Sequence, residues 1–186
     1  MRQFFFTLVL FIVVTCVQGW AADEFAMVRC GADVGQAMVG KRSSNERVVV
    51  IEARHKDLGL KDLGASEISD QLFLIFWRIC NSEYAELVNT KNGLIRAVLP
   101  LPAESLFSPH AVLEECQVAG KTISDAGIVV LDNSNRQRPK DYNDHIERIM
   151  LPGKMAWRID EVQERFVPMP TQGLSCPMNR SSLDLK

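Results

Sequence analysis

The chain has 186 residues, of which 47% are hydrophobic and 24% are charged, a balance typical of one globular domain with its own core. Its 21 basic and 23 acidic residues give a formal net charge of −2 and are interspersed along the sequence. Because the sequence contains no basic stripe, its composition argues against a nucleic-acid partner.

The first 21 residues have the order of a secretory signal peptide. Arg2 precedes an uncharged apolar run over residues 4–17, and the small residues Gly19 and Ala21 occupy the positions that a signal peptidase reads. A membrane anchor is the alternative, but the run has about 14 residues and a span needs roughly 20. We therefore expect these residues to be cleaved. The product would be one exported domain over residues 22–186, periplasmic or extracellular, with no stable membrane insertion.

Four cysteines remain after the signal peptide, namely Cys30, Cys80, Cys116 and Cys176. An even number of cysteines in an exported chain predicts two disulfides, and four cysteines allow three pairings. The sequence has no Cys-x-x-Cys spacing, which argues against a metal or redox site. Because Cys30 and Cys176 lie near the two mature ends, we prefer a Cys30–Cys176 bridge that ties the ends together. Cys80–Cys116 would then lie inside the sheet.

The first part of the mature chain predicts two strands and one short helix. Residues 25–29 indicate a short strand, and the β-branched residues of 47–54 indicate a second strand. Between them, Asp33 is a candidate helix cap and Gly40 a helix stop. The apolar face of this helix would be formed by Val34, Ala37 and Met38.

A charged loop contains a repeated motif, Lys-Asp-Leu-Gly, at residues 56–59 and again at 61–64. The two glycines predict successive tight turns. In residues 72–80 both alternating faces are largely apolar, which is typical of a strand that is covered on both sides.

The strongest hairpin signal is the Asn-Gly dipeptide at residues 92–93. It predicts a pair of strands over residues 83–89 and 94–99. Residues 112–118 and 122–131 predict another pair of strands around a short glycine-containing turn.

The last part of the chain predicts a helix, two strands and a tail. Residues 141–150 have the spacing of an amphipathic helix. Residues 154–160 alternate as a half-buried strand, with the inward positions Met155, Trp157 and Ile159. Residues 165–169 would be its hairpin partner at a sheet edge, and residues 177–186 a flexible tail.

These elements predict an α+β, strand-dominated fold with about eight strands and two short helices. Because the connections are short, we expect antiparallel pairing. The chain would form an antiparallel sheet or small, partly open barrel with the helices against it, stapled by two disulfides.

No segment carries a catalytic or cofactor motif. The sequence lacks a nucleophile elbow, a phosphate loop and a dinucleotide fingerprint. We therefore predict no catalytic residues, no metal and no cofactor, and we favour a non-enzymatic binding or inhibitor-like module. Loops on rigid scaffolds often carry recognition. The charged loop would contact another envelope or secreted protein through His55, Lys56, Asp57, Lys61 and Asp62.

Two other interpretations stay open at this point. One is a secreted hydrolase whose site is assembled from distant segments around His55 or His110 with a nearby carboxylate, because triads are spatial rather than sequential. The other is a structural envelope protein that self-associates through a sheet edge.

One resemblance concerns architecture alone. With Cys30 after a short predicted strand and Cys176 near the end, the chain is similar in size and disulfide placement to small exported sheet proteins such as periplasmic lysozyme inhibitors.

Overall fold

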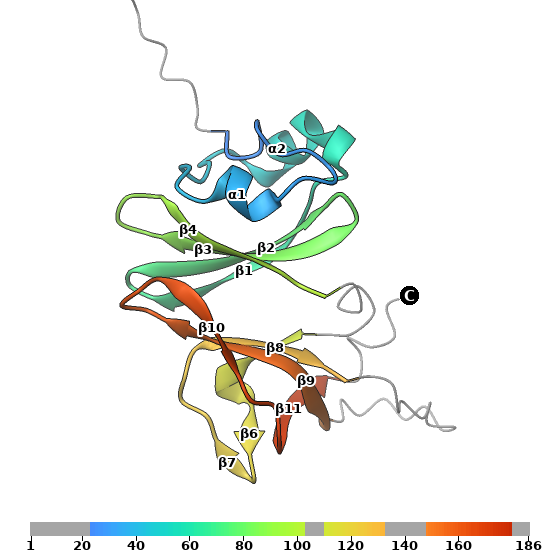
Figure 1. The fold of residues 1–186 in the computed structure, drawn as a ribbon, viewed down its shortest axis with the longest axis vertical. Helices are drawn as coiled ribbons and strands as arrows, with labels where there is room; N and C mark the ends of the chain where they lie inside the picture. The colour runs from blue at the N-terminus through green and yellow to red at the C-terminus, as the bar shows by residue number, and fades with distance from the viewer. Residues whose placement is uncertain (1–22, 103–109, 133–147, 180–186) are drawn as a thin grey trace, which may run out of the picture.

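The computed structural model describes residues 23–102, 110–132 and 148–179. The predicted signal peptide and its cleavage point lie outside these residues. Two antiparallel sheets dominate the described chain (Figure 1). The first sheet is a meander in the order β1 (Lys61–Ser69), β2 (Leu72–Ile79), β3 (Ser82–Asn89) and β4 (Ile95–Pro100).

The second sheet is assembled from strands that are further apart in sequence. Its order is β5 (His110–Val112), β8 (Gly127–Leu131), β9 (Arg148–Asp160), β11 (Leu174–Asn179), β6 (Gln117–Val118) and β7 (Lys121–Thr122). A further strand, β10 (Arg165–Met169), pairs with β9. The helical elements are α1 (Val34–Met38), α2 (Val48–Arg54), η1 (Lys56–Leu58) and η3 (Leu113–Glu115).

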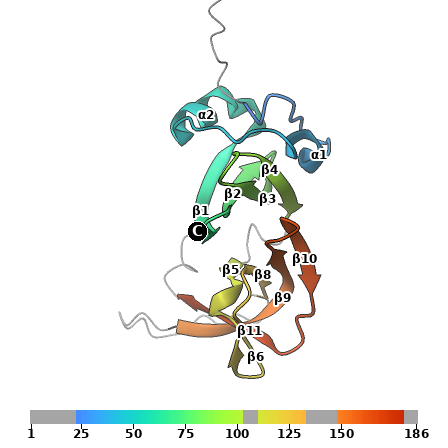
Figure 2. The same ribbon diagram turned by 90° about the vertical axis from the view of Figure 1, so that its left-hand side faces the viewer.

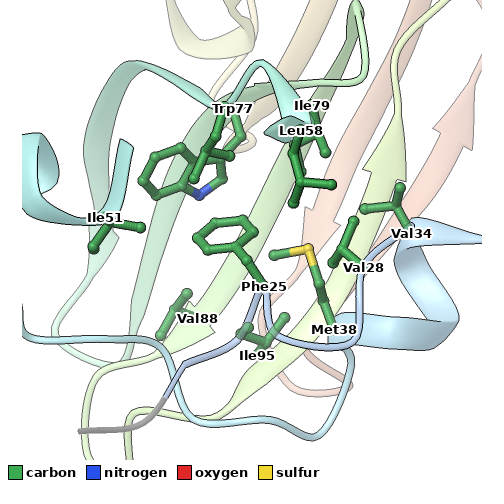
Figure 3. Close-up of a cluster of buried hydrophobic side chains, with 11 residues drawn as sticks. Phe25, Val28, Val34, Met38, Ile51, Leu58, Trp77, Ile79, Val88 and Ile95 are labelled. Atoms are coloured by element: carbon green, nitrogen blue, oxygen red, sulfur yellow. The ribbon is translucent and has the colours of Figure 1, made fainter. Parts of the chain in front are cut away.

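The elements stack in layers along the long axis of the molecule (Figures 1 and 2). Helices α1 and α2 cover the outer face of the β1–β4 sheet, and the second sheet lies against its other face. The buried side chains form three clusters, because both sheets are covered on two sides. In the cluster beneath the helices, Phe25 lies between Trp77 and Met38 (Figure 3).

Strand β2 shows why its residues are apolar on both faces. Leu72, Leu74 and Phe76 are buried between the two sheets. Trp77 and Ile79 point the other way and are buried beneath the helices. Since side chains alternate along a strand, a strand that separates two cores needs apolar residues at nearly every position. The prediction of a doubly covered strand is confirmed.

The strand-dominated, antiparallel fold with short helices and two disulfides is confirmed. The described chain holds eleven strands rather than about eight, arranged as two sheets without a closed barrel. The predicted helix after Asp33 is α1, with Val34 and Met38 buried and the Asp33 side chain accepting a hydrogen bond from the Gln36 amide. The predicted Asn-Gly hairpin is the β3–β4 pair.

Two predicted strands near the N-terminus are wrong. Residues 25–29 form turns, in which the Val28 amide donates to the Phe25 carbonyl at 3.0 Å. Residues 47–54 form helix α2 instead of a strand. The β-branched run favours a strand locally, but packing overrides this preference because Ile51 inserts into the core from one helical face.

The two copies of the repeated motif adopt different structures. Gly59 in the first copy has φ 59°, ends η1 and forms the predicted turn. The second copy lies inside β1, where Gly64 has φ 113° at an irregularity in the register with β2. The second predicted turn is therefore wrong, because Gly64 lies at a bulge within a strand.

The predictions for residues 112–131 are confirmed in part, because β6 pairs with β7 across a short turn and β5 pairs with β8. Residues 141–147 of the predicted helix over 141–150 lie outside the described chain, and its last three residues belong to β9. The predicted tail is wrong over 177–179, which complete β11, and 180–186 lie outside the described residues.

Strand β9 is confirmed over residues 154–160, but its inward face differs from the prediction. Trp157 and Ile159 are buried between the sheets, whereas Met155 is 39% exposed. Ala156, predicted to face solvent, is buried in the cluster on the opposite face. Strand β10 is its hairpin partner, as predicted.

The preferred disulfide pairing is wrong. The bridges are Cys30–Cys80 and Cys116–Cys176, with Cα–Cα distances of 5.4 and 4.1 Å. The physical reason is the layering, because Cys30 lies in the helical layer and Cys176 lies in the second sheet. The terminal bridge that suggested the resemblance to lysozyme inhibitors is therefore absent. No helix in the described part of the chain is long and apolar enough to cross a bilayer.

Candidate functional site

Helix α2 presents apolar side chains to solvent in its first turn. Val48, Val49 and Val50 are 38%, 64% and 38% exposed. Valine is a poor helix former, and the N-cap residue Arg47 makes no side-chain capping bond. Neither helix propensity nor burial therefore accounts for three valines at these positions.

Tertiary contacts hold α2 in place. Ile51 is 3% exposed and belongs to the core beneath the helices. Arg54, at the other end, forms ion pairs with Glu46 at 2.6 Å and with Asp23 at 3.7 Å. These contacts fix the inner and lateral faces of α2 and leave its first turn uncovered.

His55 directly follows α2 and points inward. Its Nε2 atom lies 2.8 Å from Asp23 Oδ1, its side chain is 12% exposed, and its ring lies 5.6 Å from that of Phe25. With Ile51 and Leu58 it forms an inward stripe at helical spacings of four and three. His55 therefore joins the end of α2 to the N-terminal segment rather than facing solvent.

Lys56 and Asp57 are the solvent-facing residues of η1. Within the described residues neither side chain makes a hydrogen bond or an ion pair. The turn is held by its backbone and by buried Leu58, whose carbonyl accepts a hydrogen bond of 2.7 Å from the Cys80 amide. These two charges are thus presented on a fixed backbone.

Lys61 and Asp62 begin strand β1 and are connected to α2 through Glu52. Glu52 accepts a hydrogen bond of 2.9 Å from the Asp62 amide and lies 3.4 Å from the Lys61 ammonium. The hydrogen bond from the Asp62 amide has the largest effect and holds the pKa of the Glu52 carboxyl below its usual value. The Lys61 ammonium acts in the same direction. The Asp62 side chain accepts from the Gly64 amide at 2.9 Å and so shapes the bulge.

The exposed part of these elements is called here the α2 surface, formed by Val48, Val49, Val50, Lys56, Asp57 and Lys61. Three of the five residues predicted to make contacts lie on it. His55 points inward and contacts Asp23, and Asp62 is half-buried and supports the bulge. Sequence reasoning missed the valines because it assigned 47–54 to a strand. The spacing of Ile51, His55 and Leu58 was the signal for a helix.

Among the described side chains, the contacts of His55 do not form a catalytic triad. The described contacts of His55 are with Asp23 and Phe25, and neither is a nucleophile for acyl transfer. His110 lies in β5, opposite Val130 of β8, and its side chain is outside what the structure describes. Among the described residues, no three His, Cys, Asp or Glu side chains gather as metal ligands.

Comparisons of the chain with protein-family models, curated proteins and solved structures give no match.

Proposed function

We propose that the protein is an exported, non-enzymatic binding module that recognises another envelope or secreted protein through the α2 surface. The observation that carries this proposal is the exposure of three consecutive valines on a helix that is intrinsically weak. The two disulfides suit an exported chain, because such bonds persist in oxidising compartments.

The arrangement has the character of a protein-binding patch. Protein interfaces have an apolar centre and a polar rim, and exposed apolar clusters mark such sites more often than single exposed side chains do. On the α2 surface the valines supply the apolar part, and Lys56, Asp57 and Lys61 supply charges of both signs. A partner would place an apolar patch on the valines and complementary charges around it.

A pull-down tests the proposal. The oxidised protein is immobilised, exposed to envelope and secreted extracts, and its retained partner is identified by mass spectrometry. The variant V48S/V49S/V50S should lose that partner, because serine removes the apolar area while its helix propensity is close to that of valine. The matched control is V162S, since Val162 is 94% exposed in the turn between β9 and β10. Equal loss in both variants, or loss in neither, would exclude the α2 surface.

The charged rim is tested with a second variant, K56A/D57A. These side chains have no partner in the described chain, so their removal should leave folding unchanged and weaken binding by about tenfold or less. Replacing Asp62 would be less informative, because its carboxylate supports the β1 bulge.

A secreted hydrolase is the second candidate, and the His55–Asp23 contact of 2.8 Å is the observation that favours it. A carboxylate that orients a histidine is the base half of a catalytic triad. Activity on ester, amide and glycoside panels that disappears in H55Q, while the variant keeps its fold, would support this candidate. An inactive wild-type protein would remove it.

A further inference from the structure

Two glutamates are buried between the N-terminal segment (residues 23–28) and the β1–β4 sheet. Glu86 lies in the centre of β3 and is 0% exposed. Glu24 belongs to the N-terminal segment and is 2% exposed. Carboxylates are almost never buried without a positive partner, because losing hydration costs several kcal/mol. Neither glutamate forms an ion pair with a basic residue in the described chain.

In each carboxyl, one oxygen accepts a hydrogen bond within the described chain and the other oxygen does not. Glu86 Oε2 accepts a hydrogen bond of 2.9 Å from the Trp77 indole Nε1–H. Glu24 Oε1 accepts one of 3.1 Å from the Ser44 amide. The remaining oxygens, Glu86 Oε1 and Glu24 Oε2, are buried without a hydrogen-bond partner in the described chain. A proton on Glu86 would neutralise this carboxyl, whose loss of hydration is otherwise uncompensated.

The surroundings favour such a proton. Burial first, and then the charge of Glu24, raise the pKa of Glu86 to about 8. Burial also raises the pKa of Glu24. Asp23 raises this pKa further, whereas His55 lowers it. The residues opposite Glu86 in the neighbouring strands, Ile75 and Val98, carry no charge.

We propose that Glu86, which keeps a proton in the core, and the buried Glu24 act as a latch, which fastens the N-terminal segment to the sheet more tightly in acid than at neutral or alkaline pH. Loss of the proton would leave two buried carboxylates that have no positive partner in the described chain. Glu86 is fixed in a central strand, whereas Glu24 lies in a segment of turns. Release of the segment is therefore the way to separate the charges. Because Asp23 binds His55 and Arg54, release also loosens the end of α2.

The direction of the pH effect follows from proton linkage. In the closed state Glu86 keeps its proton up to pH about 8, whereas in the open state it returns to the ordinary value of 4.5. The open state thus releases a proton between these two values, and opening becomes more favourable as the pH rises through that window. Above pH 8 both states are ionised at this group and the effect levels off.

Amide hydrogen exchange tests the latch. The exchange rates of the Ser44 and Val28 amides are compared between the full-length oxidised protein and E86Q at each pH from 5 to 9. The glutamine of E86Q keeps an acceptor for Trp77 and cannot ionise. The ratio of the wild-type to the variant rate should rise by up to about tenfold per pH unit and become constant above pH 8. A ratio that does not change with pH would overturn the proposal.

A spectroscopic readout locates the proton and does not depend on E86Q being folded. The Trp77 indole resonance should titrate with a midpoint near pH 8, because its acceptor is Glu86. In E24Q the midpoint should move to lower pH, since the neighbouring charge is gone. The Trp157 indole, buried between the sheets, is the internal control. An invariant Trp77 resonance, or the same midpoint in E24Q, would contradict a proton that is held on Glu86 under the influence of Glu24.

Discussion

At the level of single residues, Glu86 places a titratable group where the fold otherwise has an apolar core. The Glu86 carboxyl can be buried because it is neutral, and the free-energy cost of keeping it protonated increases as the pH rises. Because the pKa of Glu86 is higher in the folded state, protonation of Glu86 stabilises the folded protein. This contribution to the free energy of unfolding is complete below pH 4.5, the pKa in the unfolded state, and is lost as the pH rises to about 8.

We therefore predict that E86Q gains stability relative to the wild-type protein as the pH increases. Between pH 5 and pH 8 the difference in the free energy of unfolding should shift by up to about 4 kcal/mol in favour of E86Q. Urea unfolding at the two pH values measures this shift. Glu67 is exposed in β1, so E67Q is the control and should show no such shift. Parallel pH profiles of wild type and E86Q would refute the assignment of Glu86 as the responsible group.

At the level of elements, helix α2 has a buried face that stabilises the protein and an exposed face that we propose for recognition. Val49 is 64% exposed, and alanine is the better helix former, so V49A should stabilise the protein by about 0.5 kcal/mol. Ile51 is buried, and I51A should destabilise it by about 2–5 kcal/mol. Thermal unfolding of the two variants measures the contrast. A destabilising V49A would mean that this valine packs against the protein and is not presented to a partner.

The success of sequence-based prediction differs from one element to the next for physical reasons. The β2–β3–β4 meander was predictable, because alternation and an Asn-Gly turn agree with the final packing. Helix α1 was predictable from the Asp33 cap. Helix α2 was missed, because its β-branched residues favour a strand more strongly than the spacing of its buried residues favours a helix. Tertiary contacts of Ile51 and Arg54 then stabilise the helix.

The candidate site was predictable only as a charged loop. Lys56, Asp57 and Lys61 are exposed as expected, since charged residues stay in solvent. The inward turn of His55 depends on Asp23, which is 32 residues away in the sequence. The Glu24–Glu86 pair depends on the N-terminal segment folding over the sheet, and no local pattern marks such a contact.

At the level of the whole molecule, each disulfide stabilises a different layer. Cys30–Cys80 ties the helical layer to the β2–β3 turn, and Cys116–Cys176 lies in the buried cluster beyond the second sheet. Removing either pair as C30S/C80S or C116S/C176S should cost about 2–4 kcal/mol. Hydrogen exchange should increase in α1 and α2 for the first variant and around β6 and β11 for the second. The same exchange pattern in both variants would contradict a layered organisation of stability.

The two sheets are also joined by a polar clamp at the rim of their shared core. Glu164, in the turn between β9 and β10, forms an ion pair with Arg96 of β4 and accepts a hydrogen bond from Asn89 Nδ2 of β3. Asn89 is 8% exposed, and its Oδ1 accepts from the Lys91 amide at 3.0 Å, so the same side chain shapes the β3–β4 turn. A buried amide that lost its acceptor would remain unsatisfied.

We predict that E164A destabilises the protein by about 1–3 kcal/mol, because it removes the ion pair and leaves the Asn89 donor without a partner. E164Q is the matched control. Its amide oxygen can still accept from Asn89, so its cost should be less than half that of E164A. Urea unfolding measures both variants, and exchange of the β3–β4 turn amides reports local opening. If E164A and E164Q cost the same, the charge on Glu164 would account for the clamp. If neither variant changes stability, the apolar core alone would hold the two sheets together.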